Sequence, residues 1–279
     1  MASAIRHAAM KSAPEEQIRP PCGLHTALEI PRAVLEAAVL PLAWPRLASA
    51  PRGDGHPVLL LPGFMASERS LIGLRAYLAS RGHAVHTWKQ GRNLGLREKT
   101  VEALDRLIEQ LHERHRRKVS LVGWSLGGLF GLCAAHAAPQ RVRSLITLGS
   151  PVAPQLGESS AARPVLALYR AVSFPESPEA HLARAAVRDA ISAPPELPIS
   201  CLYSHSDGVV PVHEARIAST SALHENIAVP GSHLGLGFNP AVLWTVAQRL
   251  AQPEDGWRRF VPGPAQAVPA GSRCVPGRA

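Results

Sequence analysis

Ser125 is the residue whose surroundings in this sequence point most clearly to chemistry. It lies at the centre of a Gly-x-Ser-x-Gly pattern, with glycines at positions 123 and 127. An apolar run over 118–123 precedes it and a second apolar run over 125–138 follows it, which is the strand–turn–helix context that such a serine needs. Side chains two positions away would collide on so sharp a turn, so both glycines are needed. The turn also places the hydroxyl at a helix N-terminus, where the helix dipole favours developing negative charge.

A serine hydroxyl is a weak nucleophile and needs a neighbouring base. Of the thirteen histidines, His233 lies in a short Pro-Gly-Ser-His-Leu-Gly turn directly after the last predicted strand. Loops at the carboxyl ends of parallel strands gather at one edge of a sheet, so a base there can reach Ser125. We predict His233 as the general base, with a loop histidine of no chemical role as the alternative.

The histidine in turn needs an acidic partner to fix its tautomer and to stabilise the imidazolium. Asp207 comes shortly after the apolar run at 199–203 and directly before a glycine. Turn chemistry alone also favours aspartate before glycine. Glu158 and Asp189 are rivals, but neither follows a predicted strand. We therefore predict a triad in the chain order Ser, Asp, His, which differs from the orders on the chymotrypsin and subtilisin folds.

Strand and helix signals alternate along the middle of the chain, and the hydrophobic period changes with them. This alternation predicts an α/β fold with a doubly wound, mostly parallel sheet, whose ligands bind at the carboxyl edge. The rhythm breaks over 151–196, which is rich in Pro, Ala and Ser and contains a helical piece at 179–191. We expect this segment to form a small cap insertion over the carboxyl edge. The predicted strands are 57–62, 83–88, 118–123, 142–148, 199–203 and 227–229, and the predicted helices are 67–80, 97–115, 125–138 and 240–250.

The length of 279 residues and the 46% content of hydrophobic residues fit one domain with a large core. We predict a flexible N-terminal segment over 1–22, a single α/β domain over 23–252 and a flexible C-terminal tail over 253–279. Within the domain, 27–47 is expected to be an amphipathic helix that is broken by Pro41 and packed on the core. A membrane-surface anchor is the alternative for this helix.

The formal net charge of +9 raises the question of an anionic partner. Basic residues concentrate only at 114–118, where a predicted helix ends and cations complement the helix dipole. Their scatter elsewhere favours a solvated basic surface, with no nucleic-acid partner. The cysteines show no CxxC spacing, so no zinc or redox motif is present, and Cys133 and Cys201 are expected to be buried thiols. The N-terminus carries no apolar leader and the cysteines fit a reducing compartment, so we predict a cytoplasmic protein, with a disulfide left open.

Residues from about 55 to 250 resemble the α/β-hydrolase superfamily, close to its bacterial lipase and esterase branch. Members usually carry His-Gly after the first core strand, whereas this chain has Pro62-Gly63. The resemblance implies that the backbone N–H groups of Phe64 and Leu126 form the oxyanion hole, with Met65 left as a substitute donor. It further implies no metal and no organic cofactor. The matching pieces are 59–64, 123–128, 148–151, 206–211 and 231–233.

The predicted function is hydrolysis of a carboxylic ester through an acyl-enzyme on Ser125, with a small molecule or a lipid as the substrate. Apolar residues in 151–196 suit an apolar acyl or alcohol group, and they suit a packed structural cap equally well. The same triad would also serve an acyltransferase or a thioesterase. A non-catalytic binding protein on a hydrolase fold, and a binder of nucleic acid or anionic membranes, are the alternatives from other classes. Peripheral membrane contact rests on the N-terminal helix and the basic charge.

Overall fold

Six parallel strands form the centre of the molecule. The computed structural model describes residues 20–95, 97–153, 159–173 and 178–261. Within them, the strands lie in the order β2-β1-β3-β4-β5-β6, and all neighbouring pairs run parallel, which confirms the predicted doubly wound sheet. The strands are β1 (Pro57–Leu61), β2 (Ala84–Thr87), β3 (Val119–Trp124), β4 (Val142–Leu148), β5 (Ile199–Tyr203) and β6 (His224–Ala228).

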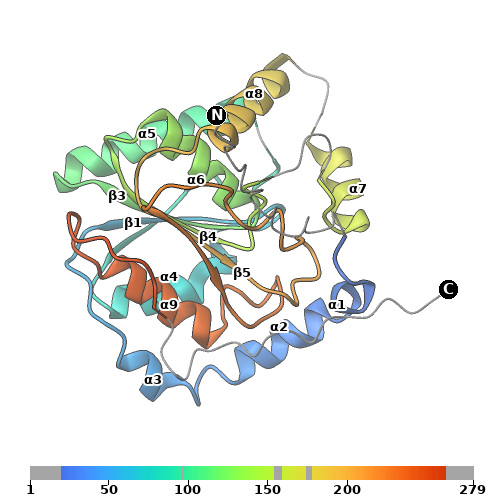
Figure 1. Cartoon of the computed structure of the whole chain (residues 1–279), viewed down its shortest axis with the longest axis horizontal. Coiled ribbons are helices and arrows are strands. Elements are labelled where there is room, and N and C mark those ends of the chain that lie inside the picture. The colour runs from blue at the N-terminus through green and yellow to red at the C-terminus, as the bar shows by residue number, and fades with distance from the viewer. Residues whose placement is uncertain (1–19, 96, 154–158, 174–177, 262–279) are drawn as a thin grey trace, which may run out of the picture.

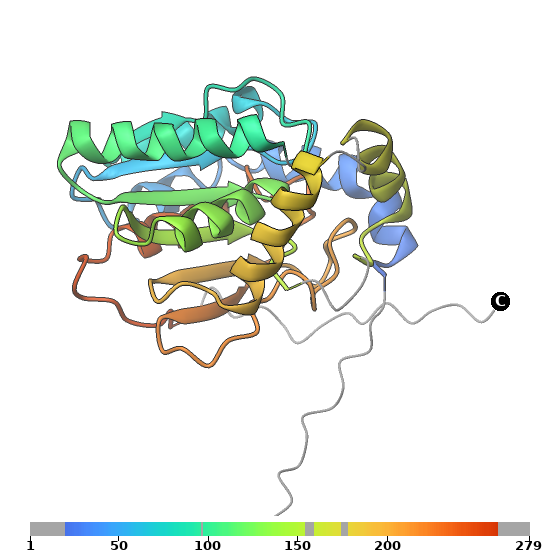
Figure 2. The ribbon, with the colours of Figure 1, turned by 90° about the horizontal axis from the view of Figure 1, so that it is seen from above.

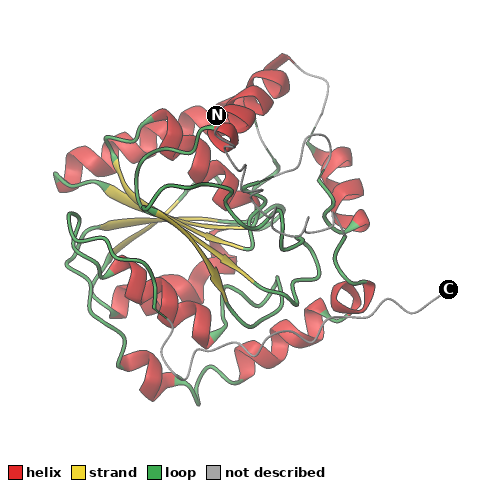
Figure 3. Cartoon of the chain, viewed as in Figure 1, coloured by secondary structure: helices red, strands yellow, loops and turns green. Residues whose placement is uncertain are grey.

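Helices cover both faces of this sheet (Figures 1 and 3). One face carries α5 (Glu98–His115), α6 (Leu126–Ala137) and α8 (Pro178–Ser192), and the other carries α3 (Trp44–Ala48), α4 (Ile72–Ser80) and α9 (Pro240–Leu250). A 3-10 turn, η1 (Glu68–Leu71), leads into α4. Each face has its own apolar core. Because the central strands are covered on both sides, β1 and β3 are buried along their whole length, as unbroken apolar runs predict.

The helix α8 corrects the expected extent of the cap. It packs against α5 and α6, and Val187, Ala190 and Ile191 join the core on that face. It is therefore the crossover helix between β4 and β5, because a parallel connection must return along the sheet. Of the segment 151–196, the helix that stands over the carboxyl edge is α7 (Arg163–Val172).

The N-terminal helices also differ from the expectation. The predicted single broken helix is three pieces: α1 (Gly23–Ala27), α2 (Glu29–Ala38) and α3. The apolar face of α2 does not pack on the core, because Ile30, Val34 and Leu35 are 67%, 62% and 65% exposed. Glu29, in contrast, is only 4% exposed. The helix is amphipathic, but it turns its charged side toward the protein. Figures 1 and 2 place α1, α2 and α7 at the same end of the molecule.

The two predicted tails fall largely outside the described residues. Residues 253–261 are described, and hydrogen bonds anchor them to the domain. The N–H of Phe260 donates to Oε2 of Glu225 at 2.6 Å, and Arg249 donates to the carbonyl of Arg258 at 2.6 Å. This part of the predicted tail is therefore bound to β6 and α9 rather than loose.

Two of the cysteines are buried free thiols and a third is in a disulfide. Cys133 and Cys201 are free and buried, as predicted, and Cys22 is disulfide-bonded. In the part of the chain that is described, no helix has the length and apolar character to cross a membrane.

Candidate active site

Ser125 occupies a strained turn between β3 and α6. Its backbone has φ 53° and ψ −124°, a conformation that costs energy for a residue with a side chain. A Cβ on Gly123 would run into the backbone of Gly128, and a Cβ on Gly127 would run into the backbone carbonyl of Leu61. The close approach of these segments explains why both flanking glycines are needed. The turn is held in place because the N–H of Ser125 donates to the carbonyl of Leu148 at 2.8 Å.

Asp207 and His233 form a buried pair at the same edge of the sheet. Nδ1 of His233 lies 2.8 Å from Oδ2 of Asp207, and both residues are buried. The other carboxylate oxygen, Oδ1, accepts hydrogen bonds from the N–H groups of Val209 and Val210, each at 2.8 Å. Two backbone donors and one ring donor thus fix the carboxylate. Because Nδ1 is the donor to this ionised group, Nε2 is left as the basic nitrogen of the imidazole.

The charge environment favours the protonated form of His233. Burial lowers the pKa of the imidazole, but the Asp207 carboxylate, through its charge and its hydrogen bond, and the Glu29 carboxylate act in the opposite direction. Their combined effect outweighs burial, so the pKa of His233 lies above its ordinary value of 6.5. A site arranged in this way stabilises an imidazolium that forms during a reaction.

The neighbouring loops bring this pair toward the serine turn. The indole Nε1 of Trp124 donates to the carbonyl of His233 at 3.1 Å, which ties the histidine loop to the residue before Ser125. Within the described residues, no hydrogen bond joins the Ser125 hydroxyl to His233. Hydrogen bonds between catalytic groups are often long without substrate and tighten when substrate binds.

Two backbone N–H groups beside Ser125 are candidates for an oxyanion hole. Those of Phe64 and Leu126 make no hydrogen bond to any described residue, whereas the N–H of Met65 donates to the carbonyl of Asn93 at 2.7 Å. Met65 is therefore occupied and does not serve as a substitute donor. A Cβ on Gly63 would stand 3.1 Å from Cβ of Ser125, so the Phe64 loop passes directly beside the serine.

Asn93 holds this loop in shape, and sequence reasoning missed it. Its side-chain Nδ2 donates to the carbonyl of Pro62 at 2.8 Å, and its Oδ1 accepts from the N–H of Gly95 at 3.1 Å. Its own N–H donates to the carbonyl of Ala66 at 2.8 Å, and its side chain is fully buried. No pattern within the sequence links Asn93 to a loop about thirty positions earlier. Glu29 on α2 was missed for the same reason.

Ser125 opens into an apolar pocket of about 220 Å³. The floor comes from the serine turn and the wall comes from α7 and the loop after β5. Phe64 and Tyr169 close one side with their rings edge to face, 5.2 Å between centroids. The pocket therefore offers an acyl or alkyl group an apolar environment next to the serine hydroxyl. Its lining residues are Phe64, Ser125, Leu126, Leu129, Pro151, Ser159, Ala161, Val165, Leu166, Tyr169, Val209 and Val210.

A second Ser–His–Asp array lies at the opposite edge of the sheet. Nδ1 of His56 lies 2.6 Å from Oδ1 of Asp54, and Nε2 lies 2.9 Å from Oγ of Ser120. His56 and Ser120 are fully buried, so no substrate reaches them. Burial, with Arg143 and His83 nearby, lowers the pKa of His56 to about 4 despite the Asp54 contact. This cluster, in which the imidazole is neutral, links the residue before β1 to strand β3 and is structural.

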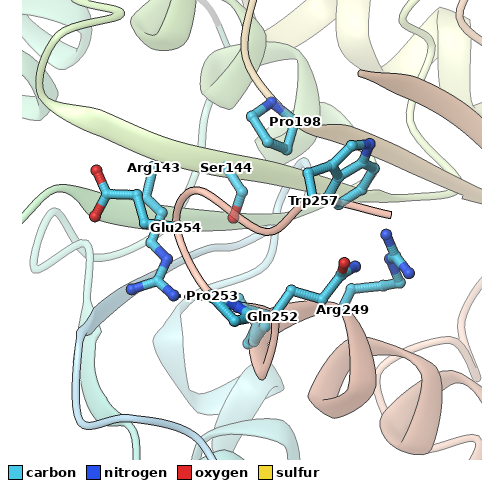
Figure 4. A pocket seen from close by; sticks show the side chains of 9 residues that line it. Arg143, Ser144, Pro198, Arg249, Gln252, Pro253, Glu254 and Trp257 are labelled. Carbon is cyan, nitrogen blue, oxygen red and sulfur yellow. Dashed lines mark hydrogen bonds between the residues drawn. The ribbon is translucent and has the colours of Figure 1, made fainter. Parts of the chain in front are cut away.

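A small hollow beside the amino end of β4 is also not a substrate site. Figure 4 shows Arg143, Ser144, Gln252 and Trp257 around it. Its volume is about 10 Å³, which is room for roughly one water molecule. The guanidinium of Arg143 is already engaged, at 2.9 Å from Oδ2 of Asp54 and at 2.6 Å from the carbonyl of Gln252.

Of the two rival acids, only Asp189 lies among the described residues, and it is not near the serine turn. Asp189 lies on α8, within the helical layer, and Glu158 falls outside the described residues. Among the residues whose placement is described, no group of three or more His, Cys, Asp or Glu side chains could hold a metal ion.

Known proteins share this architecture. A family model described as the alpha/beta hydrolase fold matches residues 56–172, which include Ser125 and end before Asp207 and His233. A pimeloyl-(acyl-carrier protein) methyl ester esterase from Aeromonas salmonicida (strain A449) is 37% identical over 100 residues. These residues are 35% of this chain and 39% of that protein, so the similarity spans well under half of the relative.

Two solved structures show the same fold. Lipase B of Aspergillus fumigatus aligns with a TM-score of 0.52 and 17% identity, over 74% of this chain and 55% of that one. The mature form of Bacillus licheniformis lipase BlEst2 aligns with a TM-score of 0.52 and 16% identity, over 71% of this chain and 92% of that one. At these identities the likeness concerns the arrangement of strands and helices.

Proposed function

Because the chain belongs to the α/β-hydrolase superfamily, we propose that it is a serine hydrolase that cleaves carboxylic esters with Ser125, His233 and Asp207. The observation that carries this proposal is the buried Asp207–His233 hydrogen bond of 2.8 Å, at the same edge of the sheet as a serine that opens into an apolar pocket. A nucleophile, an oriented base and a water-poor acyl site are the parts that acyl transfer requires.

In the first half of the proposed reaction, Nε2 of His233 takes the proton from Ser125 while Oγ attacks the ester carbonyl. Asp207 keeps the imidazole in the required tautomer and stabilises its protonated form. The N–H groups of Phe64 and Leu126 hold the oxyanion of the tetrahedral intermediate. Donors of this kind are each worth on the order of 10²–10³ in kcat. The alcohol leaves with the proton that His233 gives back.

In the second half, a water molecule repeats the sequence on the acyl-enzyme. His233 removes a proton from the water, the hydroxide adds to the acyl carbonyl, and the Ser125 oxygen leaves with the proton from the imidazolium. The products are a carboxylic acid and the free enzyme. An alcohol in place of water would give acyl transfer, and a thioester in place of the ester would use the same groups.

The pocket suits an ester whose acyl group is apolar. Its lining is almost entirely aliphatic and aromatic, and burial of each methylene there contributes about 0.8 kcal/mol to binding. The name of the Aeromonas relative describes an esterase for a methyl ester. We propose a small-molecule or lipid ester as the substrate class, and the predicted cytoplasmic location remains a prediction from the sequence.

We further propose that a lipid surface is a partner of the N-terminal helices. Leu24, Ile30, Val34, Leu35 and Leu42 are all more than 60% exposed, and exposed apolar side chains that gather in one region mark an interaction site.

The position of this surface favours lipid over a protein partner. The hydroxyl of Thr26 on α1 donates to the carbonyl of Gly208 at 2.6 Å, and the next residues, Val209 and Val210, line the pocket. The helix α1 therefore lies against the loop that lines the pocket, so a lipid surface that covers the neighbouring apolar side chains would bring an ester close to the pocket. The net charge of +9 adds a general attraction to an anionic surface.

The function is tested with a chain-length series of p-nitrophenyl esters, with wild type and Ser125→Ala in parallel. We expect hydrolysis by the wild type and a loss in kcat of about 10⁶ in the variant, since removing the nucleophile disables the whole triad. Added alcohol and matching thioesters measure acyl transfer and thioesterase activity. Equal activity of the two proteins would refute the proposed nucleophile.

A further inference from the structure

Glu29, the first residue of α2, reaches both loops that carry the proposed acid and base. Its Oε1 accepts hydrogen bonds from the N–H of Gly208 at 2.8 Å and from the N–H of His233 at 3.0 Å. Its Oε2 accepts from the N–H of Leu234 at 2.8 Å. In Figure 1, α1 and α2 (blue) lie next to the orange loops that follow β5. One buried carboxylate thus joins the backbone beside Asp207 to the backbone of His233.

These contacts are of a strong kind. A carboxylate accepts several hydrogen bonds at once, and bonds from backbone N–H groups to a charged acceptor are about twice as strong as neutral ones. Without Glu29, the buried N–H groups of Gly208 and His233 would lose their acceptor, at a cost of unsatisfied buried donors. The two loops have other links to each other, because the hydroxyls of Ser204 and Ser206 donate to the carbonyl of Gly231 at 2.6 Å and 3.0 Å. Besides the Asp207 contact with the imidazole ring, Glu29 is the link between these loops that reaches the backbone of His233.

We propose that Glu29 is a positioning residue for the reaction: it holds the Asp207 and His233 loops in register and places a second negative charge beside the imidazolium. This inference rests on the proposed function of the triad. The inference makes the N-terminal helices part of the proposed active site. These helices precede the first strand of the sheet, and Glu29 lies about 180 positions before Gly208.

The charges around this site are few and identifiable. Asp207 and Glu29 both raise the pKa of His233 against the effect of burial. The guanidinium of Arg32 lies 4.0 Å from the Glu29 carboxylate and donates to the carbonyl of Ser206 at 2.7 Å. His25, on α1, is close enough for Glu29 and Asp207 to act on its own protonation. Removal of the Glu29 charge should therefore make His233 easier to deprotonate.

Glu36 provides a matched control on the same helix. Its carboxylate accepts from the N–H of Ser232 at 2.7 Å and from Nδ2 of Asn239 at 3.0 Å. It anchors α2 to the histidine loop one residue before His233, and the interactions that shift the pKa of His233 come from Asp207 and Glu29. Glu36→Gln should weaken the docking of α2 without changing the charge that acts on the imidazole.

The test compares wild type, Glu29→Gln and Glu36→Gln by the pH dependence of kcat/KM for one p-nitrophenyl ester. For Glu29→Gln we expect kcat to fall by roughly tenfold to a hundredfold, which is the usual cost of misplacing catalytic groups. The acidic limb of the kcat/KM profile should move to lower pH. KM should stay close to the wild-type value, because Glu29 does not line the pocket. For Glu36→Gln the acidic limb should stay at the wild-type pH.

A second readout does not depend on hydrolysis. In the Ser125→Ala background, NMR titration of the His233 ring should give a lower midpoint with Glu29→Gln and an unchanged midpoint with Glu36→Gln. If Glu29→Gln does not fold, Glu29→Asp replaces it: the shorter carboxylate keeps the charge and loses the reach, so kcat falls while the midpoint stays. An unchanged kcat and midpoint in the Glu29 variant, or an equal shift in Glu36→Gln, would overturn the inference. An inactive wild type with the expected NMR shift would instead refute the proposed function alone.

Discussion

The backbone of Gly149 lies directly against the carboxylate of Asp207. A Cβ on Gly149 would stand 2.9 Å from Oδ2 of Asp207 and 3.0 Å from Nδ1 of His233, so it would crowd both atoms that share the hydrogen bond. Gly149 also has φ +54°, in the left-handed region that favours glycine. The end of β4 is therefore shaped to leave room for the acid–base pair.

Gly149→Ala is expected to separate this pair. The added methyl group would push Asp207 or His233 out of place, and we expect kcat to fall by about a hundredfold, as for other small displacements of catalytic groups. Thermal unfolding should also show a loss of about 1 kcal/mol or more from the left-handed backbone. Gly73→Ala is the control, because its Cβ would meet Phe238 at an ordinary 3.4 Å in a helix. If Gly149→Ala keeps full activity, the proposed pair is not needed for catalysis.

The pH dependence of activity should report the raised pKa of His233. The imidazole acts as a base in its neutral form, so kcat/KM should rise with pH, with a midpoint above the ordinary 6.5. Asp207→Asn removes the main influence that raises this pKa, so the midpoint should move to lower pH. The same change should lower kcat by about 10⁴, because the tautomer is no longer fixed. A midpoint below 6.5 in the wild type would contradict this electrostatic account.

Asn93→Ala should loosen the proposed oxyanion loop. The change removes the side-chain hydrogen bonds to Pro62 and Gly95, and so frees the segment that carries the Phe64 N–H. We expect kcat to fall, by up to about 10²–10³ if that donor is lost completely, while KM changes little. Steady-state kinetics with an ester of fixed acyl chain measure this. A rise in KM with constant kcat would assign Asn93 to substrate binding instead.

The exposed face of α2 should bind lipid vesicles. We expect Ser125→Ala protein to sediment with vesicles of phosphatidylcholine and phosphatidylglycerol, and less with phosphatidylcholine alone. Adding Val34→Ser and Leu35→Ser should weaken binding at least about tenfold, since each buried side chain contributes about 1.5–3 kcal/mol. Thermal unfolding is the control for intact structure. A monomeric protein that does not bind the vesicles would contradict lipid as the partner. So would a dimer that dissociates when Val34→Ser and Leu35→Ser are introduced.

The helices, the strands and the residues at the strand ends could be predicted from the sequence, because they follow from patterns among neighbouring residues. Ser125 follows β3, Asp207 follows β5 and His233 follows β6, so a parallel sheet brings all three to one edge. Met65 was left open as an oxyanion donor, and its bond to Asn93 decides against it. Such contacts between distant loops leave no trace in local spacing.

The orientation of α2 was predicted wrongly for a related reason. Its spacing of apolar residues correctly indicates an amphipathic helix, but periodicity does not say which face turns inward. Here the buried N–H groups of Gly208 and His233 need an acceptor, and Glu29 provides it. Those partners lie beyond position 200, so the sequence of the helix alone does not show which face must turn toward them.

The most direct test of the central claim is covalent labelling of the folded protein with a fluorophosphonate, followed by peptide mapping. The probe forms its bond only with a serine that a neighbouring base activates. The account predicts one adduct per chain, on Ser125, and almost none in His233→Ala. A folded wild type that stays unlabelled, or an adduct on another serine, would contradict the claim that Ser125 is the nucleophile.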